Sequence, residues 1–451
     1  MLKLVSSLTA LSLVTLGSAA LAEPTPTPAA PAATAPEAAP TEVPPTKAPE
    51  TAKPPAEVKP KASGWKGFRI QSEDGAYQLR IGGQLQVDAW GFPGDEAKAY
   101  VDEVRIRRMR VNLRATVAKH YDFRLLVDFA DARLQLLDAV IETTHLDEIR
   151  LRVGKDKSPV SFDRLQSGTA LLFLERSATT YAAPNRDLGL QLVGKIGKGL
   201  VDYQLGLWDG APDGATVEQD TDDGFDFAGR ITFQPFVSSD LPALKELLIG
   251  ASGSFGAAKG TFAAPQVAAP RSSGRASWFK FAAGADLATT VVADGDRARV
   301  GGHLYWRYGP VSLFGEFLSS SQELALADVR GKVTNTAYVA QATALLTGDD
   351  ASWSGVKPTA DFDPSVGGSG AVELAVRWTE LAIGDEAFDL GLADPKKSAR
   401  KASSLTVGVN WYLNPAVKLQ LDYERTSFKD GAADGDRPTE NLIGARAQLL
   451  F

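Results

Sequence analysis

Apolar and polar residues alternate along most of the chain from residue 64 to residue 451. Between residues 76 and 91, most odd-numbered positions carry Tyr, Leu, Ile, Val or Ala, whereas most even-numbered positions carry Gln, Arg or Asp. The same period of two recurs over 121–129, 201–207 and 417–424. A period of two is that of a β-strand with one apolar and one polar face. The pattern therefore predicts an all-β domain.

A membrane barrel is favoured over a soluble β-sandwich, which would show the same alternation. The polar face is densely charged, and many segments reach about 10 residues, the length that a tilted strand needs to cross a bilayer. The last segment ends at Phe451, as in the C-terminal assembly signal that it resembles. Counting the segments predicts a closed transmembrane antiparallel barrel of about 16 strands with an aqueous lumen. Five aromatic residues near the expected strand ends are assigned to interfacial girdles, with aromatic residues of a packed core as the alternative: Trp90, Trp208, Trp306, Trp411 and Tyr412.

The N-terminal region differs in character from the barrel. Residues 1–22 combine Lys3, an apolar stretch and small residues, which is typical of a cleaved signal peptide. Residues 23–62 are almost entirely Pro, Ala, Thr, Glu and Lys, so they cannot bury a core and are expected to form a disordered periplasmic tether. The tether's lysines would allow contact with anionic cell-wall polymers or serve only as solvated linker charges. The barrel domain is assigned to 63–451.

Composition excludes several classes of function. The chain has no cysteine, and its three histidines lack the spacing of metal ligands, so no metal site and no cofactor are expected. The formal net charge of -7 gives no global basic field for nucleic acid. No nucleophile, base and orienting group form a recognisable motif, so we do not expect an enzyme. Beyond residue 22, no apolar run is long enough for a transmembrane helix.

The densest charge cluster is the segment VRIRRMRVNLRA at 104–115. The apolar face falls on even positions before Arg107 and on odd positions after Arg108, so the phase of the alternation flips between these two residues. A regular strand would place one of them in lipid, at a cost of about 2–4 kcal/mol. We therefore predict a β-bulge there, which lets adjacent side chains point to one side.

The bulge would direct a ladder of arginines into the lumen, where guanidinium groups suit oxyanions. The ladder consists of Arg105, Arg107, Arg108, Arg110 and Arg114. The alternative is that these arginines are ordinary wall charges, paired with carboxylates of the next strand such as Asp122 and Asp128.

The segment between Lys155 and Arg186 is the longest break in the alternation in the first half of the barrel. We expect it to fold inward as a constriction loop. Basic residues could add positive charge there, and Asp138 on the preceding strand could accept a proton from a partly protonated oxyanion such as phosphate. The alternative is that these are charges of a surface loop. The basic residues concerned are Lys155, Lys157 and Arg164.

Several motifs resemble the phosphate-selective porin O/P family: FRIQSEDGAYQLRIGGQLQVDAW, IRRMRV, YDFRLLVDFAD, LRVGKDK, FLERS, NRDLGLQL and LTVGVNWYLNPAVKLQLDYERT. Residues 210–370 match less. The resemblance implies a 16-stranded barrel, a homotrimer in the lipid of the bacterial outer membrane, and passage of phosphate or related anions. It places the family's paired constriction arginines on Arg107 and Arg108, its constriction aspartate on Asp138 and a constriction-loop lysine on Arg164.

These features predict an outer-membrane porin for passive diffusion of small anions, with phosphate or polyphosphate as candidate substrates. The Pro-Ala tether is not required by the family and the family's full set of lumenal lysines is missing, so a general anion preference is favoured over strict phosphate specificity. One alternative is a general porin whose mouth is dominated by the acidic stretches 220–226 and 349–350. Another is a structural anchor of the envelope that acts through the tether.

Overall fold

The computed structural model describes residues 61–62, 67–95, 99–216 and 222–451. The predicted signal peptide lies outside these residues, as does the predicted tether apart from residues 61–62. Among the described residues, no helix is both long enough and apolar enough to span a bilayer.

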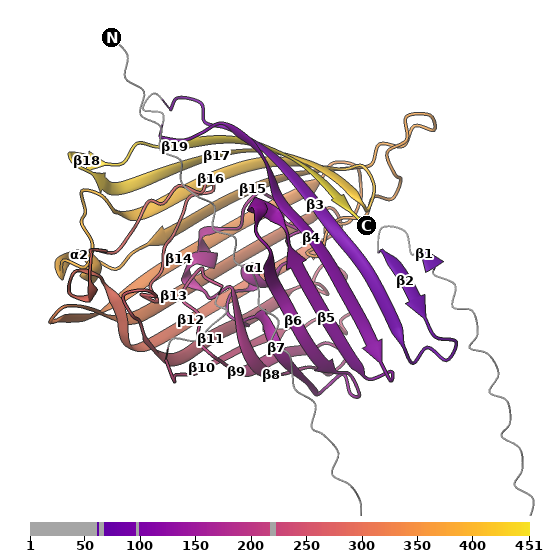
Figure 1. The fold of residues 1–451 in the computed structure, drawn as a ribbon. Helices are drawn as coiled ribbons and strands as arrows, with labels where there is room; N and C mark the ends of the chain where they lie inside the picture. Colours follow the sequence, from indigo (N-terminus) through magenta and orange to yellow (C-terminus); the bar gives the residue numbers. More distant parts are fainter. Residues whose placement is uncertain (1–60, 63–66, 96–98, 217–221) are drawn as a thin grey trace, which may run out of the picture. The chain divides into compact units, whose positions relative to one another are not determined.

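Sixteen antiparallel strands form a closed barrel, as the alternation predicted (Figure 1). Each strand pairs with the next along the chain, and the last pairs with the first. The barrel strands are β3 (Gln78–Gly91), β4 (Glu103–Val117), β5 (Tyr121–Asp128), β6 (Gln135–Thr143), β7 (Arg150–Lys157), β8 (Arg186–Ile196), β9 (Val201–Trp208), β10 (Asp226–Phe233), β11 (Leu248–Lys259), β12 (Val292–Tyr308), β13 (Val311–Leu326), β14 (Val329–Leu345), β15 (Ala371–Ala382), β16 (Ala399–Tyr412), β17 (Val417–Ala432) and β19 (Glu440–Leu450).

The remaining elements are short. Three strands lie outside the barrel count: β1 (Lys61–Ala62), β2 (Phe68–Gln71) and β18 (Gly435–Asp436). The helical turns are η2 (Ala130–Ala132), α1 (Phe162–Leu165), η3 (Ala178–Ala182), η4 (Leu287–Thr289) and α2 (Glu386–Asp389). Of these, α1 and η3 belong to the connection between β7 and β8.

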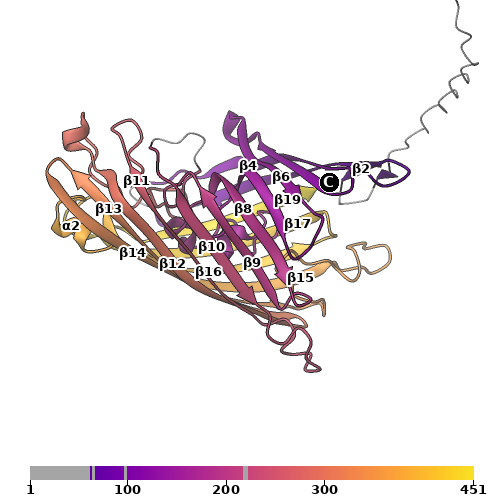
Figure 2. The same ribbon diagram turned by 90° about the horizontal axis from the view of Figure 1, so that it is seen from below.

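The barrel closes where β19 meets β3. Beyond the last strand residue, Phe451 and Gly83 exchange two backbone hydrogen bonds of 2.9 and 3.1 Å. A side chain at position 83 would collide with the Phe451 ring, so this close approach needs glycine. The next stretch of β3 pairs with β2, where Phe68 lies opposite Ile81. Figures 1 and 2 both place β2 and the C-terminus at one end of the barrel, which we call the terminal end.

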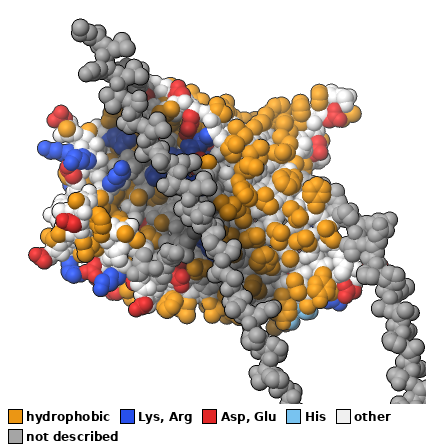
Figure 3. All heavy atoms as spheres, viewed as in Figure 1, with side chains coloured by type: hydrophobic (Ala, Val, Ile, Leu, Met, Phe, Trp, Pro, Cys, Tyr) orange, Lys and Arg blue, Asp and Glu red, His pale blue; other side chains and the backbone are white. Residues whose placement is uncertain are grey.

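The two faces of the wall differ as expected for a barrel in lipid. Outward side chains such as Ile106 and Met109 are each 47% exposed, and Figure 3 shows a broad apolar surface over the right half of the face in view. Inward side chains are polar and often buried, as are Asp88 and Arg446, which form a bidentate ion pair across the closing strands with distances of 2.6 and 2.7 Å.

The predicted aromatic girdle is wrong for three residues. Trp90, Trp208 and Tyr412 point into the barrel and are only 5%, 1% and 5% exposed. All three occupy even positions, on the same face as the polar residues of their strands, so the alternation itself directs them inward. Trp306 and Trp411 are half-buried and donate to the backbone oxygens of Ala243 and Ser369.

Candidate functional site

The paired arginines Arg107 and Arg108 lie at a β-bulge in β4. Arg108 is opposite Gln86 and Ile106 is opposite Val87, so Arg107 is an extra residue without an opposite number on β3. Both arginine side chains point inward, with 19% and 6% of their surfaces exposed, between the outward Ile106 and Met109. The predicted bulge is confirmed.

The other three arginines of the ladder differ in their partners. Arg105 binds Glu103 at 2.7 Å and Asp131 at 2.6 Å. Arg110 binds Asp128 at 2.7 Å, as the wall-charge alternative expected for this residue. Arg114, by contrast, makes no ion pair or side-chain hydrogen bond with the described residues and is exposed. At about 3.3 Å per residue, the ladder follows the lumen for roughly 25–30 Å.

Arg114 belongs to a row of arginines at the terminal end of the lumen. The strand register places Arg69 opposite Arg80, Arg80 opposite Arg114, and Arg114 opposite Arg124. Arg124 binds Asp156 at 2.6 Å, whereas Arg80, like Arg114, has no carboxylate partner among the described residues. Directly opposed like charges destabilise a sheet. This row therefore leaves positive charge available to solutes.

The connection between β7 and β8, residues 158–185, folds into the lumen and will be called the constriction loop (Figure 1). Its start is held by Glu316 of β13, which accepts hydrogen bonds from Ser161 Oγ at 2.8 Å and from the Phe162 backbone. Its middle is held by side chains of the opposite wall: Gln86 Nε2 donates to Gly168 O (3.0 Å), Asn410 Nδ2 to Leu172 O (3.0 Å), Lys418 Nζ to Leu171 O (2.8 Å) and Gln448 Nε2 to Thr169 O (3.1 Å). The predicted inward fold is confirmed.

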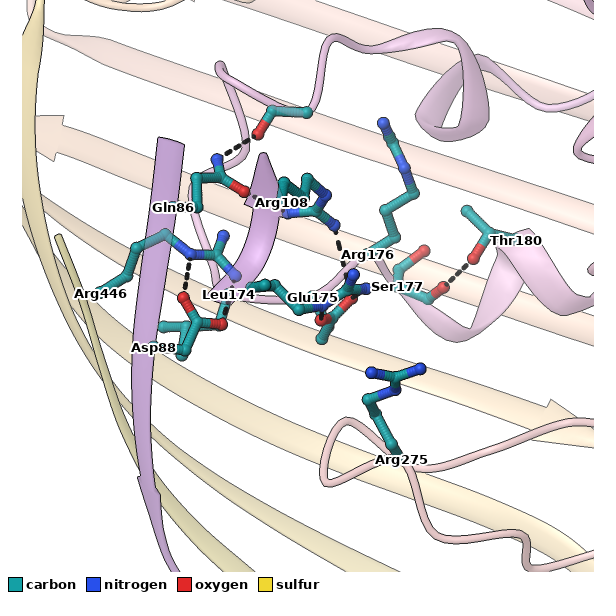
Figure 4. Close-up of polar contacts among 12 residues, drawn as sticks. Gln86, Asp88, Arg108, Leu174, Glu175, Arg176, Ser177, Thr180, Arg275 and Arg446 are labelled. Atoms are coloured by element: carbon teal, nitrogen blue, oxygen red, sulfur yellow. Dashed lines mark hydrogen bonds and ion pairs between the residues drawn. The ribbon is translucent and has the colours of Figure 1, made fainter. Parts of the chain in front are cut away.

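Glu175 of the constriction loop meets the paired arginines. Its two carboxylate oxygens accept hydrogen bonds from Arg107 Nε and, at 2.9 Å, from Arg107 Nη2. Arg108 Nη2 lies 3.7 Å from the same carboxylate and Arg108 Nη1 donates to Gln86 at 2.7 Å (Figure 4). Although burial acts to raise it, the pKa of Glu175 is held well below its ordinary value by Arg107 and Arg108. Glu175 was not among the predicted site residues.

The predicted basic residues of this region take different places. Lys157 lines the lumen and its Nζ donates to the backbone oxygens of Leu165 at 3.3 Å and Gln166 at 2.8 Å. Arg164 also lines the lumen and donates to Thr180 O. Lys155 is buried in β7.

Asp138 lies at the lumen wall but is already engaged. It binds Arg186 Nε at 2.7 Å and lies 3.5 Å from Arg124 Nε. A carboxylate held between two guanidinium groups is well placed to orient them. Arg186, which belongs to the motif NRDLGLQL, was not among the predicted site residues.

A second inward connection, residues 260–291 between β11 and β12, was missed by the sequence analysis. Its Gly274 backbone donates to Glu440 at 3.1 Å, and its Trp278 oxygen accepts from the Ala399 backbone at 2.9 Å. It adds Arg271 and Arg275 to the lumen lining. The signal was present as a run of about 30 residues without alternation, in the part of the sequence where the family resemblance is weakest.

Together these segments enclose a lumenal cavity of about 1870 Å³. Among the described residues, fifteen arginines and one lysine line it, against seven aspartates and glutamates. The acidic stretches proposed for a general porin contribute little to this lining. Asp226 is buried against Arg297 and Arg299, and Asp349 accepts from Thr347 and the Thr359 backbone. Residues 217–221 are outside the described part of the chain.

Two of the three histidines lie together in the fold. His120 and His145, in neighbouring turns, stack with their ring centroids 4.4 Å apart. Within the described residues, no group of three or more His, Asp or Glu side chains is placed to hold a metal ion.

Two solved structures share this architecture. The outer membrane channel DcaP of Acinetobacter baumannii superposes with a TM-score of 0.55 at 14% identity, covering 85% of this chain and 99% of that one. The anion-selective porin from Comamonas acidovorans gives a TM-score of 0.53 at 14% identity, covering 83% and 100%. At such low identity these likenesses show the fold alone.

The sequence comparisons identify the family. Porin O of Pseudomonas aeruginosa is 29% identical over 142 residues, which cover 29% of this chain and 31% of that protein. The matches to curated relatives thus span about a quarter to a third of their lengths. The family model described as phosphate-selective porin O and P matches residues 79–451, almost the whole barrel. The chain therefore belongs to the phosphate-selective porin O and P family.

Proposed function

We propose that this porin lets small inorganic anions, phosphate among them, diffuse passively through its arginine-lined lumen. The observation that carries the proposal is a reversal of charge. The whole chain has a formal net charge of -7, yet in the described part of the barrel sixteen basic and seven acidic side chains line the lumen. Rings and rows of one charge select ions in a pore without a rigid covalent site or a cofactor.

The proposed anion path follows β4 and the constriction loop. The paired arginines Arg107 and Arg108 form its central binding point, because guanidinium groups bind oxyanions through two parallel hydrogen bonds. Arg105, Arg110 and Arg114 continue the path on either side, and Lys157 and Arg164 add charge from the loop. Asp138 orients Arg186 and Arg124. A path of roughly 25–30 Å with repeated guanidinium groups would also suit extended polyanions such as polyphosphate.

The test is a phosphate titration of chloride current through single channels in planar bilayers. Phosphate should block the current of the wild-type protein in a saturable way. The variant Arg107→Gln/Arg108→Gln should need at least about tenfold more phosphate for half-block, since two charge-assisted contacts are lost. Arg425→Gln, which removes an outward-facing arginine of β17, is the matched control and should behave like wild type. Equal block in all three proteins would contradict the proposal.

We further propose that three copies assemble in the outer membrane, as the family resemblance implies. The native mass of the purified protein in mild detergent measures this. A mass near that of one chain would contradict it.

A further inference from the structure

The paired arginines already hold a carboxylate from the same chain. Glu175 forms a two-point contact with Arg107, and its carboxylate lies within ion-pair distance of Arg108 (Figure 4). The Glu175 side chain is only 15% exposed. Its two oxygens occupy the positions that two oxygens of a bound oxyanion would take. An anion that passes this point must therefore displace Glu175 or share the guanidinium groups with it.

The backbone holds Glu175 in place independently of its side chain. The backbone oxygen of Glu175 accepts a hydrogen bond of 2.8 Å from Arg377 Nη1 of β15. The preceding backbone nitrogen, of Leu174, donates to Asp422 of β17 at 2.7 Å. Loss of the Glu175 carboxylate would leave both of these anchors. The loop should keep its course, so the effect of the charge can be measured separately from the fold.

We propose that Glu175 is a tethered competitor that makes the arginine pair discriminate oxyanions from halides. This inference rests on the proposed function. An oxyanion presents two oxygens and can replace both hydrogen bonds that Arg107 makes to Glu175. A chloride ion is a single point and replaces them less well. The competitor also weakens binding, because conduction requires that an ion leave as well as enter.

Glu175→Gln should strengthen the interaction of the arginine pair with all anions. Two guanidinium charges would then face the lumen without a counter-ion in contact, so chloride conductance should rise. Half-block by phosphate should occur at a concentration about tenfold lower than in wild type. The preference for phosphate over chloride should fall, because chloride no longer has to displace a carboxylate.

A second variant tests the geometry. Glu175→Ala leaves room for a small carboxylate, and formate added to the bath should restore the lower chloride conductance in a saturable way. Formate should have little effect on the wild-type protein at the same concentration. Glu175→Asp, whose shorter side chain keeps the charge, should lie between wild type and Glu175→Gln.

The control for charge alone is Glu323→Gln, on β13 outside the lumen lining, where the carboxylate accepts from the Asp296 backbone. It removes the same charge and should leave block unchanged. If phosphate blocks the wild type but Glu175→Gln and Glu175→Ala match it, the inference is wrong and the proposed function stands. If phosphate does not block the wild type and the channel shows no anion preference, the proposed function itself fails.

Discussion

Arginine side chains have two different surroundings in this lumen, and burial separates them. Arg446 is fully buried and its charge is matched by Asp88 through two hydrogen bonds. Arg114 is exposed to the lumen and has no carboxylate partner among the described residues. A matched and buried charge holds the wall together, whereas an unmatched and wet one remains available to solutes.

Removal of one partner of the closing ion pair should destabilise the barrel strongly. Asp88→Asn would leave the Arg446 guanidinium buried without its counter-ion, which typically costs about 3–5 kcal/mol. We expect a lower unfolding temperature in detergent, measured by the heat-dependent mobility shift on gels. Replacing both partners by apolar residues, Asp88→Leu/Arg446→Met, should cost less than the single change. A single variant as stable as wild type would show that the pair is dispensable.

Residue-level prediction succeeded where a position was tied to the alternation. The phase flip required Arg107 and Arg108 to share a face, and they do. Glu175 could not be found in this way, because it lies in a loop without alternation and its contact with β4 spans 68 residues of sequence. Asp138 was among the predicted site residues. Its ion pair with Arg186 could not be predicted, because it depends on how the strands are arranged in the barrel.

At the scale of a single element, the β-bulge in β4 places two guanidinium groups at one level of the lumen. Without Arg107, β4 would alternate regularly, with Val104, Ile106 and Met109 outside and Arg105, Arg108 and Arg110 inside. Arg107 is therefore an insertion that adds a charge without disturbing the register on either side. Alternation made the strands predictable. The connection 260–291 has no alternation, and its partners Glu440 and Ala399 lie far away in sequence, so its inward course was not predictable.

Two single-residue deletions in β4 should differ in their effects on barrel assembly and on phosphate block. Deletion of Arg107 should remove the bulge, and the barrel should assemble normally but need more phosphate for half-block. Deletion of Ile106 should keep the register but turn Arg107 outward into lipid, at a cost of about 2–4 kcal/mol. Yield of heat-resistant barrel and phosphate block measure the two effects. Equal assembly of both deletions would contradict the assignment of Arg107 as the extra residue.

At the scale of the whole molecule, the fold brings basic side chains to the lumen and places many acidic side chains elsewhere. The net charge of -7 alone would suggest a channel without attraction for anions. Closure of the strands gathers fifteen arginines and Lys157 around one lumen, while carboxylates such as Asp226 are turned into buried ion pairs. The architecture and the strand count could be predicted from the alternation. The positive charge of the lumen could be predicted only in part. Loops and strand pairings without a local sequence pattern bring in Arg271, Arg275 and Arg186.

The most direct measurement of the central claim is the reversal potential of the purified wild-type protein in a planar bilayer under a potassium chloride gradient. The predicted result is a potential of the sign set by chloride, and larger when the gradient is centred near 0.1 M than near 1 M. Salt reduces the screening length from about 10 Å to about 3 Å over this range, which weakens the field of the lumenal arginines. A potential of the sign set by potassium, or one close to zero at both concentrations, would contradict an arginine-lined anion path.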